Sequence, residues 1–170
     1  MKIRLANEKD IESMVKLDKE CFGDYGAKKD YFSKKLKNPS GNIIIAYDDK
    51  GKIIGFAVFE ILEKDIIPED FCDLKIKHPI KGRWVHMVAF TTKDNYKDKK
   101  SDWEILSFAE EFAKNKGCTE SYVPLSKEHP LKQNGVFEFW KNSGYENVGE
   151  IKWIASPNEL IECFFYRKSL

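Results

Sequence analysis

A lysine-rich loop joins a predicted strand to a predicted helix, and this segment is suited to bind phosphate. Residues 84–90 are apolar and form the strand, residues 93–100 form the loop, and residues 101–116 form an amphipathic helix. A loop that brings backbone N–H groups and positive side chains to a helix N-terminus can hold a phosphate group. No glycine lies between Arg83 and Gly117. The backbone of the loop would therefore have to approach a phosphate without the space that a missing side chain provides.

Glu60 is a candidate proton acceptor on an earlier predicted strand. It follows Phe59 and the apolar residues 56–58, so it is expected at a sheet edge or in a cleft. Burial there would raise the pKa of the carboxyl group, because desolvation disfavours the ionised form. The alternative is a carboxylate that faces solvent.

Residues 63–82 form the least regular segment of the chain, and a loop of this length is typical of a lid or an insertion. Its carboxylates can attract a cationic acceptor such as a polyamine, an aminoglycoside or a lysine side chain. Four lysines are interleaved with them, which favours a mixed, solvated surface instead. The acidic residues are Glu63, Asp65, Glu69, Asp70 and Asp73.

The remaining elements must position these residues. Asn7 and Asp10 form a variant capping box at the start of the first helix, and Ser101 and Glu104 form an S-x-x-E box at the start of the long helix. The predicted elements are a strand at 2–6, helices at 8–22 and 30–37, a hairpin of 42–47 and 52–62, the strand 84–90, the helix 101–116, a strand at 121–125, a short helix at 136–142, and strands at 146–154 and 161–167.

Composition excludes several classes of protein. A chain of 170 residues is most simply one domain, and its net charge of +1 argues against nucleic-acid binding driven by bulk electrostatics. The four cysteines form no C-x-x-C and the three histidines are scattered, so no metal site is predicted. We find no apolar window long enough to span a membrane and no signal-peptide pattern, and we expect a cytoplasmic protein with reduced thiols.

The order of the elements resembles the GCN5-related N-acetyltransferase (GNAT) superfamily over essentially the whole chain. Four local phrases carry the resemblance: IRLANEKD at 3–10, GKIIGFA at 51–57, FWKNSGY at 139–145 and FFYRKSL at 164–170. The resemblance implies an α/β fold with a mixed, mainly antiparallel sheet and helices on both faces. It implies one domain over residues 1–170, with 63–82 as a possible lid or insertion.

The family's acyl-CoA pyrophosphate motif, Arg/Gln-x-x-Gly-x-Gly/Ala, falls on residues 97–102. A lysine takes the first position, but both small residues are replaced, by Lys100 and Asp102. The amides of residues 99–103 would face the pyrophosphate, while the carboxylates of Asp98 and Asp102 oppose it. The alternative is a solvated loop with an N-cap at Ser101. The cofactor-binding residues predicted from this motif are Lys97, Lys99, Lys100, Ser101 and Asp102.

The resemblance also assigns residues to the pantetheine arm of acetyl-CoA. The strand 83–92 corresponds to the family strand that splays from its neighbour and hydrogen-bonds the pantetheine, so Phe90 and Thr92 would lie at the V-shaped opening. The asparagine that often precedes the short helix maps onto Gln133 or Asn134, and either side chain can contact the pantetheine.

Two candidate bases follow from the same comparison, His86 and Glu60. His86 lies near the position of a family carboxylate that deprotonates the amine, and a histidine with a pKa of about 6.5 can replace it. The alternative is a structural histidine on a half-buried strand. The family's acidic tyrosine is replaced by Trp140, which cannot donate a proton of comparable acidity, and Tyr145 is predicted to lie in the core.

The implied activity is transfer of an acetyl group from acetyl-CoA to a primary amine of a small molecule or peptide, by direct attack in a ternary complex without a metal. The rival hypothesis is a non-catalytic module that binds a ligand or a partner, which the missing glycines and Trp140 favour. A third is a structural dimerisation domain, suggested by the aromatic content that an aromatic core explains equally well. A homodimer fits any of the three.

Overall fold

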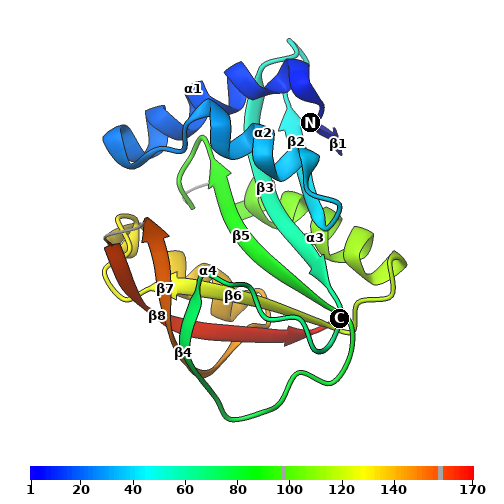
Figure 1. Cartoon of the computed structure of the whole chain (residues 1–170). Coiled ribbons are helices and arrows are strands. Elements are labelled where there is room, and N and C mark those ends of the chain that lie inside the picture. Colours follow the sequence, from blue (N-terminus) through cyan, green and yellow to red (C-terminus); the bar gives the residue numbers. More distant parts are fainter. Residues whose placement is uncertain (97–98, 157–158) are drawn as a thin grey trace.

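Eight strands form one mixed sheet in the computed structural model, which describes residues 1–96, 99–156 and 159–170 (Figure 1). The strand order is β1-β2-β3-β5-β6-β8-β7-β4, and the neighbours are antiparallel except β5 and β6, which are parallel. The strands are β1 (Lys2–Leu5), β2 (Gly41–Tyr47), β3 (Ile53–Leu62), β4 (Phe71–Ile76), β5 (Trp84–Thr92), β6 (Glu120–Ser126), β7 (Glu146–Ser156) and β8 (Glu159–Ser169). The predicted mixed, mainly antiparallel sheet is confirmed.

Helices cover both faces of this sheet, as predicted. Successive residues of a strand point to opposite faces. In β2, Ile43 and Ile45 pack with α1 (Ile11–Phe22) and α2 (Lys29–Lys37). Ile44 and Ala46 pack on the other face, with the residues of α3 (Lys99–Asn115) and α4 (Val136–Asn142). Burial on both faces explains why β2 reads as a continuous apolar run rather than an alternating one.

The predicted capping box at the start of the first helix is confirmed. The backbone N–H of Lys9 donates to Asn7 Oδ1 (3.0 Å), and the N–H of Asn7 donates to Asp10 Oδ2 (2.8 Å). The box caps a short 3₁₀ turn, η1 (Glu8–Asp10), which leads directly into α1. Arg4 donates two hydrogen bonds of 2.8 Å to the carboxylate of Asp10, so the same residue ties β1 to α1.

The predicted N-cap at Ser101 is wrong, because α3 already begins at Lys99 and Ser101 lies within its first turn. Lysine has a high helix propensity, and the two lysines that precede Ser101 extend the helix toward its N-terminus. The S-x-x-E pattern therefore falls inside the helix and does not mark its boundary.

The segment 63–82 is more regular than predicted, because residues 71–76 form the edge strand β4, paired with β7. Phe71 and Ile76 pack against a buried cluster that contains Trp84 and Phe165. The register shifts between Cys72 and Lys75, and Asp73 has a φ of 48°. This bulge interrupts the alternation of apolar and polar residues, which is why the sequence did not indicate a strand.

The chain ends in a β7–β8 hairpin that follows α4, and it continues the sheet beyond β6 (Figure 1). Two 3₁₀ turns lie in the connections, η2 (Gly23–Tyr25) after α1 and η3 (Lys132–Asn134) before α4. No helix in the described part of the chain is both long enough and apolar enough to cross a bilayer.

Candidate active site

The central feature of the site is the point where β5 and β6 stop pairing. Among the described residues, the parallel ladder between the two strands runs from Trp84–Glu120 to His86–Tyr122 and ends there. Both strands continue beyond this point, and Figure 1 shows them diverging. We call this divergence the β5–β6 fork. From residue 87 onward, the backbone N–H and C=O groups of β5 that face β6 are therefore not paired with β6.

A bulge in β5 lies at the start of the fork. Met87 pairs with Phe59 and Ala89 pairs with Val58, so Val88 is an extra residue between them. An extra residue bends its strand and increases the local twist. The bulge therefore helps to turn β5 away from β6 while β5 stays paired with β3 as far as Thr92.

Aromatic rings pack beside the fork on the α3 and α4 face. The ring centroid of Phe90 lies 6.0 Å from that of Tyr96, 5.6 Å from that of Phe139 and 5.7 Å from that of Trp140. All four side chains are buried. We call them the aromatic cluster. It joins the end of β5 to α4 and brings the predicted pantetheine residue Phe90 next to Trp140.

The loop after β5 folds back against this cluster. Asn95 and Tyr96 have left-handed backbone conformations, with φ of 47° and 66°. The hydroxyl of Tyr96 donates to the carbonyl oxygen of Phe90 (3.4 Å), and the side-chain amide of Asn134 donates to the carbonyl oxygen of Asn95 (3.4 Å). Asn134, a predicted cofactor residue, is thereby held close to the loop that leads into α3.

The predicted pyrophosphate residues lie at the N-terminus of α3, with one exception. Lys97 lies outside the described residues, and Lys99 is the first residue of the helix. The side chain of Lys100 is exposed and that of Ser101 is half-buried. Asp102 is fully buried, and its charge adds to the effect of burial in raising the pKa of Tyr96.

The end of α1 covers the end of β5 on the opposite face. Thr91 Oγ1 donates to Asp18 Oδ1 (2.7 Å), and the thiol of Cys21 contacts the carbonyl oxygen of Thr92 at 3.4 Å. The N–H of Ala27 donates to the other oxygen of Asp18 (2.6 Å). Burial raises the pKa of Asp18, and these two hydrogen bonds oppose that shift. Asp18 was not predicted as a site residue, although a carboxylate within the apolar stripe of α1 was a visible signal.

Glu60 and His86 lie side by side on neighbouring strands, as a cross-strand pair of β3 and β5. Glu60 Oε2 lies 3.5 Å from His86 Nδ1, and Glu60 Oε1 accepts hydrogen bonds from Lys35 Nζ (2.6 Å) and Asn38 Nδ2 (3.2 Å). We call these four residues the Glu60 cluster. Glu60 is 8% exposed and His86 is 1% exposed, so the alternative of a solvent-facing carboxylate is excluded.

The predicted rise in the pKa of Glu60 is wrong. The close contact with His86 lowers the pKa of Glu60, burial opposes this, and Lys35 lowers the pKa further, to about 2. The partners that favour the ionised form therefore outweigh the cost of desolvation. Glu60 is therefore ionised at neutral pH, and it can stabilise a positive charge on a neighbouring group.

The side chain of Phe71 covers His86. The two ring centroids lie 4.7 Å apart with the rings nearly perpendicular, and Trp84 lies on the same face with its centroid 6.1 Å from that of His86. Both ring nitrogens of His86 are fully buried, and neither makes a hydrogen bond of normal geometry to a described residue. The 3.5 Å contact between Nδ1 and Glu60 Oε2 is longer than an ordinary hydrogen bond. The segment 63–82 thus reaches the Glu60 cluster through one aromatic ring of β4.

The predicted site residues fall into two groups on opposite faces of the sheet. Phe90 belongs to the α3 and α4 face, whereas Glu60 and His86 belong to the α1 and α2 face. The fork begins directly after His86 and lies between the two groups. No three His, Cys, Asp or Glu side chains converge as a metal site within residues 1–96, 99–156 and 159–170.

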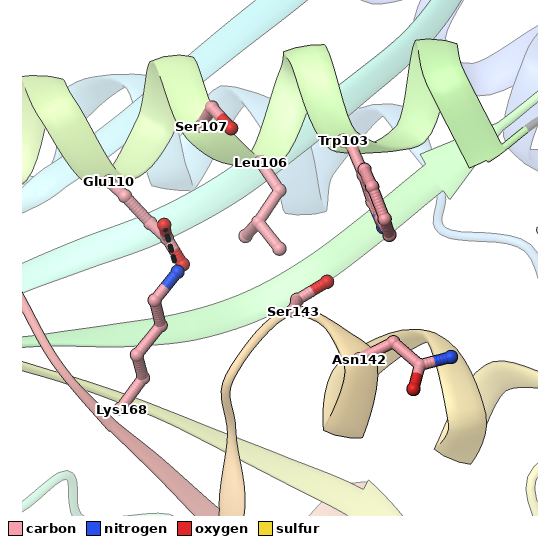
Figure 2. Close-up of a pocket in the computed structure, with 7 residues that line it drawn as sticks. All are labelled: Trp103, Leu106, Ser107, Glu110, Asn142, Ser143 and Lys168. Atoms are coloured by element: carbon pink, nitrogen blue, oxygen red, sulfur yellow. Dashed lines mark hydrogen bonds and ion pairs between the residues drawn. The ribbon is translucent and has the colours of Figure 1, made fainter.

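A small hollow of about 170 Å³ lies between α3 and the C-terminal end of α4 (Figure 2). One side is closed by the ion pair of Glu110 and Lys168 (2.6 Å), and Trp103 stands at the opposite end. The hydroxyl of Tyr145 bonds to Ser121 Oγ (2.7 Å) and donates to Glu110 (3.0 Å). Tyr145 is buried, which confirms its predicted place in the core.

Comparison with known proteins gives a family and a fold. The model of a family described as "Acetyltransferase (GNAT) family" matches residues 11–145, which is more than half of the chain. Comparison with curated protein sequences gives no match.

Solved structures are similar over nearly the whole chain. A probable acetyltransferase from Staphylococcus epidermidis ATCC 12228 has a TM-score of 0.72 at 18% identity, covering 99% of this chain and 98% of its own. The ribosomal-protein-S18-alanine N-acetyltransferase from Escherichia coli has a TM-score of 0.69 at 7% identity, covering 99% and 92%. The PaiA N-acetyltransferase from Thermoplasma acidophilum, in complex with coenzyme A, has a TM-score of 0.67 at 16% identity and covers 100% of both chains. At these identities the similarity concerns the fold.

The lowered pKa of Glu60 predicts an acid-dependent loss of stability. In the folded state the pKa of Glu60 is about 2, below its ordinary value of 4.5. Ionised Glu60 therefore contributes its full stabilisation of the fold above pH 4.5, and this contribution is lost as the pH falls through 2. Urea unfolding of the wild type and Glu60→Gln across this range should therefore show that the difference in free energy of unfolding shrinks as the pH falls.

The matched control is Glu20→Gln, at an exposed position of α1, which should retain the pH dependence of the wild type. An equal pH dependence in Glu60→Gln and the wild type would contradict the ionised, partnered state of Glu60.

Proposed function

We propose, from the premise that this chain belongs to the acetyltransferase (GNAT) family, that it transfers an acetyl group from acetyl-CoA to a primary amine. The observation that carries the proposal is the β5–β6 fork, which begins directly beside the Glu60 cluster and opens toward the N-terminus of α3. A donor bound along β5 would meet the two parts of the molecule that an acyl transfer needs: a site for the diphosphate and a group that takes a proton.

The diphosphate of the donor would bind at the first turn of α3. The positive end of the helix dipole lies there, and the exposed side chain of Lys100 adds a charge. Lys97 and Lys99 belong to the same proposed site through their positions in the sequence. Asn134, tied to the carbonyl oxygen of Asn95, would contact the pantetheine nearby.

The pantetheine arm would lie along β5 between Val88 and Thr92. The backbone N–H and C=O groups on the fork side of this stretch lie beyond the end of the β5–β6 ladder and suit an extended polar chain. Hydrogen bonds from this strand would orient the thioester, and one backbone N–H would stabilise the developing oxyanion.

His86 would accept the proton of the attacking amine, and Glu60 would stabilise the resulting imidazolium. The distance of 3.5 Å between His86 Nδ1 and Glu60 Oε2 fits this pairing, and Lys35 holds Glu60 in place. The ring of Phe71 must then move aside to admit an amine, because it covers His86. Trp140 supplies no acidic proton, so the departing thiolate would take its proton from solvent.

The acceptor is proposed as a primary amine of a small molecule or a peptide. One structurally similar protein is named for acetylation of an alanine of a ribosomal protein, and only the amine is carried over to this chain. The thiols of all four cysteines are free, which supports a reducing, cytoplasmic environment for the reaction.

A second candidate function is ligand or partner binding without catalysis. Asp102 favours it, because a fully buried carboxylate occupies the motif position where a small residue is expected beside a diphosphate. A nearby negative charge weakens binding of a second anion. Binding of coenzyme A separates the proposed transferase from a module that binds a different ligand or a partner, and thiol release separates it from a module that binds coenzyme A without catalysis.

Coenzyme A should stabilise the folded chain. At about a hundred times its Kd, a ligand of the native state raises the free energy of unfolding by roughly 2.7 kcal/mol. Lys100→Glu should abolish this increase, because it reverses the charge beside the proposed diphosphate. The measurement is thermal unfolding of both proteins with coenzyme A and with acetyl-CoA.

The control is Lys52→Glu, which reverses an exposed charge in the turn between β2 and β3 and should keep the full effect. No stabilisation of the wild type by either ligand would favour the second candidate. Stabilisation that Lys100→Glu retains would remove α3 from the phosphate site.

His86→Gln should reduce turnover by at least about 100-fold, the usual contribution of a general base, and leave stabilisation by coenzyme A unchanged. Thiol release across a panel of amines measures turnover, and thermal unfolding with coenzyme A measures donor binding. Glutamine keeps most of the volume of this buried position. Unchanged turnover would return His86 to a structural role.

A further inference from the structure

One side of α3 carries two exposed aromatic side chains. Trp103 is 46% exposed and Phe108 is 37% exposed. Together with Ile3 of β1 they line a broad hollow of about 770 Å³. Most large apolar side chains of this protein are buried, so two exposed aromatic rings on one helix suggest an interaction surface.

The remaining side chains of this surface are polar and form a stripe between the two rings. The stripe repeats at helical spacing, which places all its members on one side of α3. Glu111 also accepts a hydrogen bond from Asn115 Nδ2 (3.3 Å). We call the whole set the α3 surface; it consists of Ile3, Lys100, Trp103, Glu104, Ser107, Phe108 and Glu111.

The order of these residues is self-complementary. Suppose that a second copy of α3 lies antiparallel to the first, related to it by a two-fold axis at the level of the Ile105–Leu106 peptide bond. Lys100 of one copy is then level with Glu111 of the other. The same operation brings Glu104 level with Ser107. Opposite charges thus meet at both ends of the contact, because a two-fold interface makes each pairing twice.

The aromatic residues follow the same symmetry. Trp103 and Phe108 lie at equal distances along the helix from the axis and on opposite sides of the polar stripe. A second copy would therefore cover all four rings, two along each side of the helix pair. Aromatic side chains contribute most of the binding energy in typical interfaces, while charged pairs at the ends set the orientation.

β1 extends this surface at the edge of the sheet. It is the terminal strand, and Leu5 (47% exposed) and Met1 (39% exposed) add apolar area beside Ile3. In Figure 1, β1 and α3 lie toward the same side of the molecule, and Ile3 lines the same hollow as α3. Two copies joined through α3 would bring these edges close together, which protects an otherwise exposed edge strand.

We propose that the α3 surface binds a second copy of this chain, with the two α3 helices antiparallel about a two-fold axis. The self-complementary placement of Lys100 and Glu111, with Trp103 and Phe108 on either side, identifies the partner as the same protein. Lys100 is the one side chain that the α3 surface shares with the proposed diphosphate site. The argument for the dimer does not depend on acyl transfer, and a dimer forms whether or not the chain is an enzyme.

Sedimentation equilibrium of the full chain over a concentration series tests this proposal. The wild type should approach about twice the chain mass of 19.8 kDa. Phe108→Lys should raise the dimer dissociation constant at least about 30-fold, because it places a charge among the aromatic rings. Ile66→Lys, at an exposed apolar position outside the surface, is the matched control and should dimerise like the wild type.

A charge exchange tests the antiparallel arrangement independently of the rings. Glu111→Lys should weaken the dimer at least about 5-fold, because two cations then face each other at both ends. Adding Lys100→Glu should restore the affinity of the wild type. A wild type that remains monomeric throughout, a dimer indifferent to Phe108→Lys, or a charge exchange that restores nothing would each overturn the proposal.

Discussion

The candidate site depends on one break in backbone pairing, the end of the β5–β6 ladder at His86. Parallel strands in the middle of a sheet normally satisfy each other's backbone groups, so a central ladder that stops after three residue pairs leaves polar backbone to be satisfied elsewhere. The bulge at Val88 turns β5 without breaking its pairing with β3. The same strand thus anchors the core and presents a polar edge.

Two different environments meet at this break. On one face, the aromatic cluster packs β5 against α4 through contacts between rings. On the other face, the Glu60 cluster holds a carboxylate between a lysine and a histidine, where its ionised state is favoured despite burial. In the proposed reaction, the Glu60 cluster would supply the proton acceptor and the open edge of β5 would hold the extended donor, and the fork adjoins both.

Sequence patterns predicted what depends on local spacing. The Asn7–Asp10 box, the hairpin of β2 and β3, and the central helix followed from residues close together in the chain, and the order of elements led to the fold. The burial of Glu60 was foreseen from its apolar neighbours, but its pKa was not, because Lys35 and His86 reach it from other elements. The bulge at Asp73 concealed β4, and so the cover that Phe71 provides over His86 could not be predicted.

The most direct test of the account is where a donor binds on the backbone. Amide nitrogen and proton chemical shifts can be followed by NMR while coenzyme A is added to the labelled chain. The account predicts that the largest changes fall on residues 88–92 of β5 and on the first turn of α3. Changes confined to other parts of the chain, with these amides unaffected, would contradict it.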